Sequence, residues 1–256
     1  MTNRRLKEIA SLAHRKYRVR MGEFCVEGVR SVAAALEAGA PLVEVLVAEE
    51  AYAEARVQAM LAGATVPVHV RPTRDLARLS DVKTSQGVLA VARTALVPEA
   101  SLHTHITVLV LDGVQDPGNV GTSLRSAAWF GADAVLASDQ TADFFNPKSV
   151  RAAMGGLWDL RLARTDDLPA ALTGLRQSGF ALYGAALDGV DARTFAPCRP
   201  SVLVLGSEAH GLTPAVGALL DAQLTIAGAP MRRGVESLNV AVAAGILLHA
   251  WLGGAA

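Results

Sequence analysis

The 256-residue sequence predicts an α/β protein made of two successive units. Short apolar runs typical of strands alternate with segments of helical period, first over residues 1–93 and again over residues 105–256. Residues 94–104 contain Pro98 and show no regular period, so we interpret them as a linker. The continuous apolar run ITVLVLD opens the second unit and is typical of a strand in a parallel sheet.

The first unit is expected to open with one helix over residues 2–20, because Leu6, Ile9 and Ala13 are spaced to share a face. Gly39 ends the second predicted helix, as glycine does after many helices. The expected elements are helix 2–20, strand 22–28, helix 29–38, strand 42–48, helix 51–62, strand 66–70, helix 73–79 and strand 87–93.

The second unit is expected to form a parallel sheet that ends in an apolar helix. Ser237 stands where an N-cap is expected, Asn239 falls in the first turn, and the almost wholly apolar run that follows predicts a buried helix. The expected elements are strand 106–112, helix 120–130, strand 132–138, helix 147–155, strand 160–164, helix 166–177, strands 180–187, 201–206 and 222–228, and helix 237–251.

Composition excludes several classes of protein. Hydrophobic residues make up 51% of the chain, yet no apolar run reaches the roughly 18 residues of a membrane span, and the N-terminus lacks the apolar region of a secretory signal. Cys25 and Cys198 lie far apart, which excludes a disulfide framework and suits the reducing cytoplasm, where we expect the protein. His103 and His105 have no third ligand nearby, so no metal site is expected.

The formal net charge is zero but unevenly spread. Residues 1–20 hold seven basic residues and one acid, so the rest of the chain is acidic. Such a segment favours a contact with a polyanion such as nucleic acid, although a solvated helix face is the commoner explanation of a charge run.

The first candidate functional segment is DGVQDPGNVGTSLRSA, which leaves a predicted buried strand and enters a helix near Asn119. A phosphate or nucleotide is the usual ligand of such a helix start. The glycine fingerprints of Rossmann and P-loop proteins are absent, which excludes those classes. The remaining pattern is N-x-G-x-x-x-R, with Asn119, Gly121 and Arg125. An N-cap asparagine and a solvent-exposed arginine would also explain it.

The second and third candidate segments lie nearer the C-terminus. In LVLGSEAHGLTP a predicted strand ends at Gly206, so Glu208 lies where open α/β sheets bind ligands, although it could instead cap a helix near Thr213. In PMRRGVESLN a cationic loop leads into the start of the last helix, a suitable place for a polar ligand. A plain Ser237 N-cap is the alternative interpretation of that junction.

Together, these three segments resemble the SpoU (TrmH-like) family of RNA ribose 2′-O-methyltransferases in the SPOUT superfamily. The stretches FCVEGVRSVAAAL and KTSQGVLAVAR are similar to the ribosomal-protein-like substrate-binding domain of its rRNA-modifying branch. One position departs from the pattern, because Ala229 stands where the family usually has Ile. The matches to the three motifs are, in order, Asn119, Gly121 and Arg125; Gly206, Glu208 and Gly211; and Pro230, Met231, Gly234, Ser237, Leu238 and Asn239.

The resemblance implies a C-terminal domain with a deep trefoil knot, a rare exception to unknotted topology. It also implies S-adenosyl-L-methionine as cofactor, RNA as substrate, a homodimer, and neither a metal nor a membrane partner. Arg125 would position and activate the ribose 2′-hydroxyl, while polar neighbours would hold that arginine and the ribose. The implied catalytic residues are Arg125, Asn119, Glu208, Ser237 and Asn239; the implied cofactor-binding residues are Gly206, Ile226, Ala229 and Leu238.

The hypothesis from the sequence is therefore an enzyme that methylates a ribose 2′-oxygen in ribosomal RNA. A methyltransferase acting on tRNA is an alternative. The additional N-terminal unit, residues 1–93, is interpreted as the substrate-binding domain, and its presence favours rRNA over tRNA as the substrate. A non-catalytic RNA-binding or ribosome assembly factor with the same fold is another alternative. Such a factor would be expected to lack Arg125 or Asn239, and the chain has both.

Overall fold

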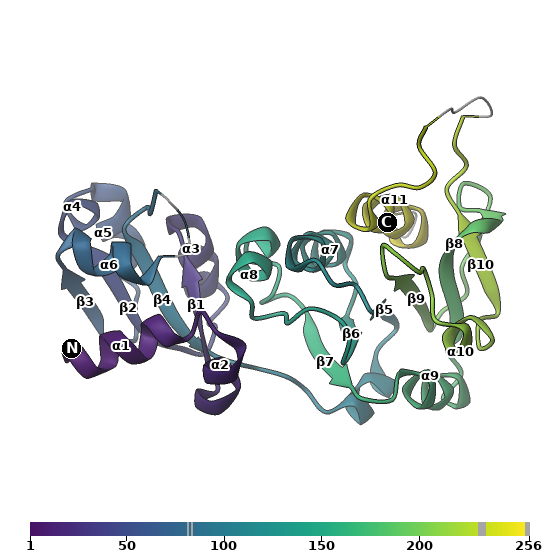
Figure 1. The fold of residues 1–256 in the computed structure, drawn as a ribbon, viewed down its shortest axis with the longest axis horizontal. Helices are drawn as coiled ribbons and strands as arrows, with labels where there is room; N and C mark the ends of the chain where they lie inside the picture. Colours follow the sequence, from purple (N-terminus) through teal and green to yellow (C-terminus); the bar gives the residue numbers. More distant parts are fainter. Residues whose placement is uncertain (81, 83, 230–233, 254–256) are drawn as a thin grey trace. The chain divides into compact units, whose positions relative to one another are not determined.

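The computed structural model describes residues 1–80, 82, 84–229 and 234–253, and the chain divides into two compact units (Figure 1). Unit 1 comprises Met1–Ala95 together with Asp143–Trp158. Unit 2 comprises Leu96–Ala142 together with Asp159–Ala256. Unit 1 is therefore built from two separate stretches of chain, the second of which is a short segment from the middle of the sequence.

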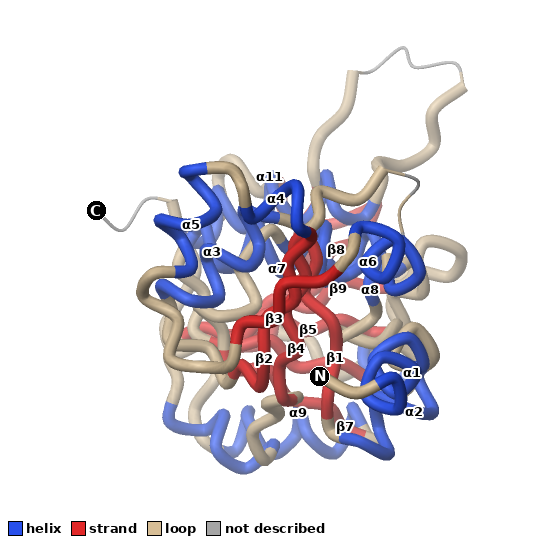
Figure 2. The backbone as a smooth tube through the Cα atoms, turned by 90° about the vertical axis from the view of Figure 1, so that its left-hand side faces the viewer, coloured by secondary structure: helices blue, strands red, loops and turns tan. Residues whose placement is uncertain are grey.

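Unit 1 contains a four-stranded sheet in the order β1-β4-β2-β3. β4 pairs antiparallel with both β1 and β2, while β2 and β3 pair in parallel, so β1, β2 and β3 all end at the same edge. Figure 2 shows α3, α4 and α5 on one side of this sheet and α1 and α6 on the other. The elements are α1 (Asn3–Ser11), α2 (Arg15–Met21), β1 (Glu23–Glu27), α3 (Val29–Glu37), β2 (Leu42–Ala48), α4 (Glu49–Tyr52), α5 (Ala55–Leu61), β3 (Val68–Arg71), α6 (Thr73–Leu79), β4 (Val88–Arg93) and α8 (Pro147–Ala153).

Two helices predicted as continuous are each interrupted. The predicted helix 2–20 is α1 and α2, and the Arg18 guanidinium donates to the backbone oxygens of Leu12 and Ala13, both at 2.8 Å, at the break. These two hydrogen bonds from Arg18 satisfy carbonyl groups that a continuous helix would have paired within itself. The predicted helix 51–62 is also interrupted and forms α4 and α5.

The segment 143–158 is fixed to the rest of unit 1 by an ion pair with a buried arginine and by aromatic packing. Arg18, only 2% exposed, donates to the Asp143 carboxylate at 2.7 and 3.0 Å. The ring of Phe24 on β1 lies 4.7 Å from that of Phe145 and 6.0 Å from that of Trp158, measured between centroids. Removing Asp143 would leave the buried Arg18 guanidinium without its charged partner, which is costly, so these contacts anchor the segment.

Unit 2 contains a six-stranded sheet in the order β10-β8-β9-β5-β6-β7, and every pairing in it is parallel. In Figure 1, α7 and α11 lie on one face of this sheet and α9 and α10 on the other. The predicted α/β class and parallel C-terminal sheet are thus confirmed. The elements are η1 (Glu99–Thr104), β5 (Thr107–Asp112), α7 (Pro117–Phe130), β6 (Ala134–Ser138), β7 (Arg161–Thr165), α9 (Leu168–Gln177), β8 (Ala181–Asp191), β9 (Ser201–Gly206), α10 (Pro214–Gly217), β10 (Ala222–Thr225) and α11 (Val240–Leu252).

The order of the strands fixes which segments meet. After β9 the chain passes β8 to reach the edge strand β10, and α11 then returns to pack on α7 and β9. The predicted burial of α11 is only partly correct: Leu247, Leu248 and Trp251 are buried, but Val242 and Ile246 are 51% and 41% exposed. Among the described residues, no helix has both the length and the apolar character needed to cross a membrane.

Candidate active site at the carboxyl edge of the parallel sheet

The two central strands of unit 2 end side by side. Asp112 at the end of β5 is in register with Gly206 at the end of β9, so the loops that follow them start together. Asp112 is 4% exposed, and its carboxylate accepts a hydrogen bond from the Thr213 backbone N–H at 2.8 Å. Sequence reasoning missed this residue, although an aspartate that closes a fully apolar run is a signal for a buried, partnered carboxylate.

The first candidate segment enters α7 earlier than the sequence predicted. The helix begins at Pro117, and Asp116 is its N-cap, accepting a hydrogen bond from the Asn119 backbone N–H at 2.9 Å. Asn119 is therefore the third residue of the helix and not its cap, which corrects the expected start near residue 120. Proline at the first helical position favours this start, because its missing N–H has no partner to lose. The Asn119 side chain is consequently available for other contacts.

The last helix also begins differently from the prediction. Asn239, not Ser237, is the N-cap of α11, and its side-chain oxygen accepts from the backbone N–H groups of Ala241 and Val242 at 2.9 and 3.3 Å. Ser237 is exposed in the preceding loop. Serine and asparagine are both good N-caps, and here the asparagine takes the position because its amide nitrogen gains a second partner.

A chain of hydrogen bonds joins the three candidate segments. The amide nitrogen of Asn239 donates to the Asn119 side-chain oxygen at 3.0 Å, and the Asn119 amide nitrogen donates to the Glu208 carboxylate at 2.7 Å. The direction of this chain follows from the helix cap. Because Asn239 turns its oxygen toward the N–H groups of α11, it presents its nitrogen to Asn119, which in turn presents its nitrogen to Glu208. The structure thus brings these three predicted residues together.

Arg125 lies on the exposed side of α7, six residues beyond Asn119. Within the described part of the chain it makes no ion pair, so its guanidinium is available to a ligand. Trp129, one turn further along α7, shares its face and is 83% exposed. The structure does not bring Arg125 or Ser237 into hydrogen-bonding contact with the asparagine–glutamate chain.

The close approach of the neighbouring backbone requires glycine at position 206. A Cβ atom at this position would lie 2.1 Å from the backbone carbon of Gly211, because the loop after β9 folds back over the strand end. Ser207 and Gly211 hold this fold-back with two mutual backbone hydrogen bonds of 2.9 Å. No larger residue fits there, whatever ligand the neighbouring loop binds.

The remaining predicted cofactor residues lie in the loop between β10 and α11. Ile226 is half-buried and Ala229 is exposed, while Leu238 is 46% exposed. The predicted motif residues Pro230 and Met231 lie outside the described residues. Residues 226–229 and 234–238 make no hydrogen bonds to backbone groups of the other residues that the structure describes. Free backbone groups beside exposed apolar side chains suit a ligand with both polar and apolar parts, such as S-adenosylmethionine.

Polar groups at the carboxyl edge of a parallel sheet, with ligand-accessible loops around them, are typical of α/β enzymes that bind nucleotide-like ligands. Residues 106–249 match the SpoU rRNA Methylase family, and residues 3–90 match the MRM3-like substrate binding domain. The first match covers more than half of the chain. The protein belongs to the SpoU rRNA methylase family.

Several known proteins are similar over almost their whole length. The 23S rRNA (guanosine(2553)-2′-O)-methyltransferase RlmP of Bacillus subtilis is 32% identical over 248 residues, which cover 96% of this chain and 95% of RlmP. The SpoU methyltransferase AviRb of Streptomyces viridochromogenes, solved with AdoMet, has a TM-score of 0.84 at 27% identity and covers 99% of this chain and 98% of its own. An AdoMet-bound rRNA methyltransferase from Sinorhizobium meliloti has a TM-score of 0.82 at 29% identity, with 98% and 94% covered.

Proposed function

We propose that this protein transfers a methyl group from S-adenosylmethionine to a ribose 2′-oxygen of ribosomal RNA, as a cytoplasmic homodimer. The observation that carries the proposal is the hydrogen-bonded chain of Asn239, Asn119 and Glu208, which unites the three segments of the site. Family membership and the full-length similarity to RlmP support the same reaction. The reducing cytoplasm also suits a chain with two free cysteines.

The reaction needs a positioned ribose hydroxyl more than it needs a strong base. S-adenosylmethionine would supply an electrophilic methyl group on a sulfonium. The bond between the 2′-oxygen and the methyl carbon would form as the methyl–sulfur bond breaks, S-adenosylhomocysteine would leave, and the hydroxyl proton would pass to water. Glu208 and Asn119 offer acceptor and donor groups in a fixed arrangement, which would hold the ribose in line with the methyl group. The guanidinium of Arg125 offers N–H donors and no acceptor, so it would act by hydrogen bonding and charge, not by removing the proton itself.

The homodimer would form through the exposed face of α7 and α11. These two helices pack on each other, and their outer surface carries Trp129, Val242 and Ile246 with exposed fractions of 83%, 51% and 41%. Exposed large apolar side chains on two helices that pack together are typical of a protein–protein interface, and tryptophan is a preferred anchor within one. Arg125 shares the Trp129 face, so the partner subunit would lie beside it and help to complete the site.

The same proposal includes the trefoil knot implied by the family. The passage of the chain across β8 to β10, followed by the return of α11 to α7, supports a knotted path. Residues 1–93 would bind the RNA substrate, in keeping with the match to the MRM3-like substrate binding domain.

The test is methyl transfer from labelled S-adenosylmethionine to unmodified rRNA and tRNA, followed by nuclease digestion to locate the label. Label on ribose in rRNA alone is expected. Label in tRNA would keep the chemistry and refute the substrate, whereas no label despite cofactor binding would refute the enzyme. Arg125→Ala is expected to lower the transfer rate at least a hundredfold while cofactor affinity changes less than twofold. Equal losses of both would show that Arg125 is structural.

A further inference from the structure

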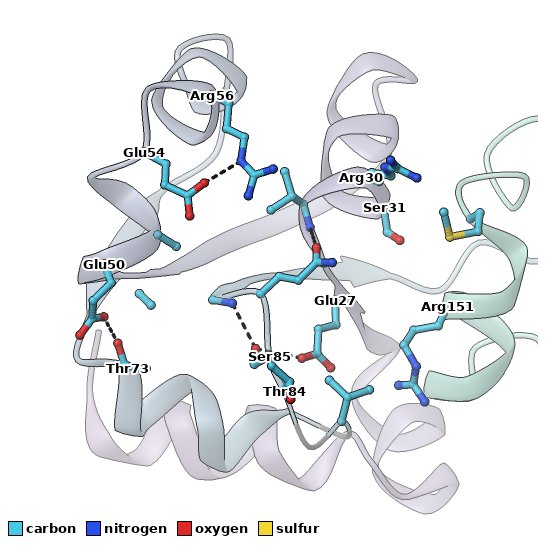
Figure 3. A pocket seen from close by; sticks show the side chains of 18 residues that line it. Glu27, Arg30, Ser31, Glu50, Glu54, Arg56, Thr73, Thr84, Ser85 and Arg151 are labelled. Atoms are coloured by element: carbon cyan, nitrogen blue, oxygen red, sulfur yellow. Dashed lines mark hydrogen bonds and ion pairs between the residues drawn. The ribbon is translucent and has the colours of Figure 1, made fainter.

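Hydrogen-bonded polar side chains outside the site described above occur in both units. In unit 1 they line a cavity of about 910 Å³ (Figure 3), where the Arg56 guanidinium donates to the Glu54 carboxylate at 2.6 Å and the Thr73 hydroxyl donates to Glu50. These pairs satisfy one another within unit 1. In unit 2 a second group, on the loop after β6, contacts the segment that leads into the first motif of the site.

The loop after β6 holds the loop after β5. Gly113, the first residue beyond β5, donates its backbone N–H to the hydroxyl oxygens of Ser138 and Thr141, at 3.0 and 3.1 Å. The Thr141 hydroxyl donates in turn to the Leu111 backbone oxygen at 2.8 Å. Gly113 has a φ of +72°, a left-handed conformation that favours glycine and turns the chain sharply after the strand. The turn is therefore held from both sides of Gly113 by one threonine.

The Thr141 hydroxyl uses its full hydrogen-bonding capacity. A hydroxyl has one proton to donate and two lone pairs that accept. Its proton goes to Leu111, so the Ser138 hydroxyl, 3.1 Å away, is the donor in the contact between the two hydroxyls. Thr141 is 3% exposed and Ser138 is 5% exposed, so water does not replace these contacts. The arrangement fixes one position for the Gly113 backbone.

Arg164 on β7 fixes the loop that carries Thr141. β7 pairs in parallel with β6, so the Arg164 side chain lies beside the loop that β6 enters. Its guanidinium donates to four backbone oxygens of this loop, those of Ser138, Asp139, Thr141 and Ala142, at 2.9, 3.1, 2.7 and 3.2 Å. A planar guanidinium that binds four carbonyl groups gives the loop a defined shape before any ligand binds.

The segment that Thr141 holds leads directly into the first motif. Val114, which is fully buried, accepts a hydrogen bond at its backbone oxygen from the Ala142 N–H at 2.9 Å. Two residues further, Asp116 caps α7 by accepting from the Asn119 N–H. The backbone between Gly113 and Asn119 is thus fixed at Gly113, at Val114 and at the helix cap. A displacement of Gly113 would be passed on to Asn119.

Glu208, the partner of Asn119 in the site, is tied to the other side of the same strand end. The Thr213 N–H donates to the Asp112 carboxylate at 2.8 Å, which closes the loop that carries Glu208. Asn119 and Glu208 therefore take their positions from adjacent residues, Gly113 and Asp112. Their mutual hydrogen bond of 2.7 Å requires that both anchors keep their places.

We propose that Thr141 is a positioning residue for methyl transfer, because it holds Gly113 and thereby sets the Asn119 amide against the Glu208 carboxylate. The proposal rests on the proposed function, in which Asn119 and Glu208 hold the ribose in line with the methyl group. Thr141 contacts neither the ribose nor the cofactor in this assignment. Its loss would misalign a bound substrate, so kcat would fall while the KM values stay near those of the wild type.

The test compares two valine variants of buried threonines at opposite ends of neighbouring strands. Thr141→Val removes the hydroxyl and keeps the branched shape of the side chain. Thr107→Val is the matched control. Thr107 is 2% exposed at the start of β5, and its hydroxyl donates to the Asp133 carboxylate at 2.9 Å and accepts from the Asp133 N–H at 3.2 Å. Each variant leaves buried polar groups unpaired, but only Thr141→Val does so beside the site.

In the transfer assay with rRNA, Thr141→Val is expected to lower kcat about tenfold to a hundredfold, the effect of a small misplacement of reacting groups. KM for RNA and for S-adenosylmethionine should change less than about twofold, and Thr107→Val should keep the wild-type kcat. Thr141→Ser should restore most of the rate, because it retains the hydroxyl. Equal kcat values in the two valine variants, or a rise in KM with kcat unchanged, would overturn the positioning role.

Nuclear magnetic resonance gives a second readout that does not depend on activity. The chain has four asparagines, so isotope-labelled asparagine yields four side-chain amide signals, and Asn119→Asp identifies the signal of Asn119 by its loss. Thr141→Val should shift this signal and speed its proton exchange with water, whereas Thr107→Val should not. An unchanged Asn119 signal in Thr141→Val would overturn the proposal. A shifted signal in a protein whose wild type transfers no methyl group would overturn the proposed function and leave the hold on Asn119 standing.

Discussion

Replacing Asn239 separates its two structural roles, the N-cap of α11 and the donor to Asn119. Asn239→Ala removes both. Loss of an N-cap costs about 1 kcal/mol, and the exposed hydrogen bond to Asn119 adds roughly 0.5 kcal/mol. The expected loss is therefore about 1.5 kcal/mol, or a little more than a tenfold rise in the population of the opened helix. Methyl transfer should fall as well, because Asn119 loses the group that orients it.

Asn239→Asp is the matched variant, because aspartate is an equally good N-cap but has no amide N–H to donate. Its carboxylate also favours the positive end of the α11 dipole. We expect at most roughly 0.5 kcal/mol of destabilisation, from the lost Asn119 bond, together with a loss of methyl transfer as large as that of Asn239→Ala. Stability and activity would then respond differently to the same position.

Hydrogen exchange of the peptide covering residues 240–252 is the suitable assay, because it reports the opening of one helix. Global unfolding of a chain with two units need not be two-state. Equal acceleration of exchange in both variants would refute the expectation that the N-cap contributes more to the stability of α11 than the Asn119 hydrogen bond does. Wild-type exchange in Asn239→Ala would refute the cap altogether, and full activity in Asn239→Asp would refute the orienting role of the Asn119 bond.

Two further predictions concern the α7 surface and the cysteines. Trp129→Glu should convert the proposed dimer to a monomer in analytical ultracentrifugation, whereas Val19→Glu, at an apolar position of α2 that is 74% exposed, should not. A monomeric wild type would contradict the interface. Burial, with a smaller effect of a nearby carboxylate, raises the pKa of the Cys25 thiol from 9.0 to about 12. Between these pH values the native protein keeps a proton that the unfolded chain releases. The free energy of unfolding should therefore fall as the pH rises from about 9 to about 12. A thiol reagent at pH 8 should accordingly titrate only the exposed Cys198 until denaturant is added, and reaction of both thiols in the native protein would show that Cys25 is accessible.

Local patterns predicted the strands well. The run LVEVLVA is β2 with the expected bounds, and SVLVLG is likewise β9, because an apolar run of strand length between turn residues has few alternative structures. The predicted helix 73–79 also coincides with α6. In these places local preference and tertiary packing agree, so the sequence alone was sufficient.

The helix boundaries at the site could not be predicted in the same way. Ser237 and Asn239 are both suitable N-caps, and the choice between them depends on a hydrogen bond to Asn119, which is 120 residues away in the sequence. The break between α1 and α2 likewise depends on the Arg18 side chain, which a charge pattern places on a solvated face but which the fold buries. Both outcomes were decided by contacts that no local pattern contains.

Because of the segment 143–158, unit 1 cannot be separated from unit 2 by a single cut in the chain. The chain crosses between the units three times, after Ala95, after Ala142 and after Trp158, so no single cut releases unit 1 intact. A terminal deletion that removes Phe24 would leave the rings of Phe145 and Trp158 without their partner. Recombination between Ala95 and Leu96 could therefore not exchange unit 1 whole, and we expect the sequence of segment 143–158 to have changed together with that of residues 1–95 during evolution.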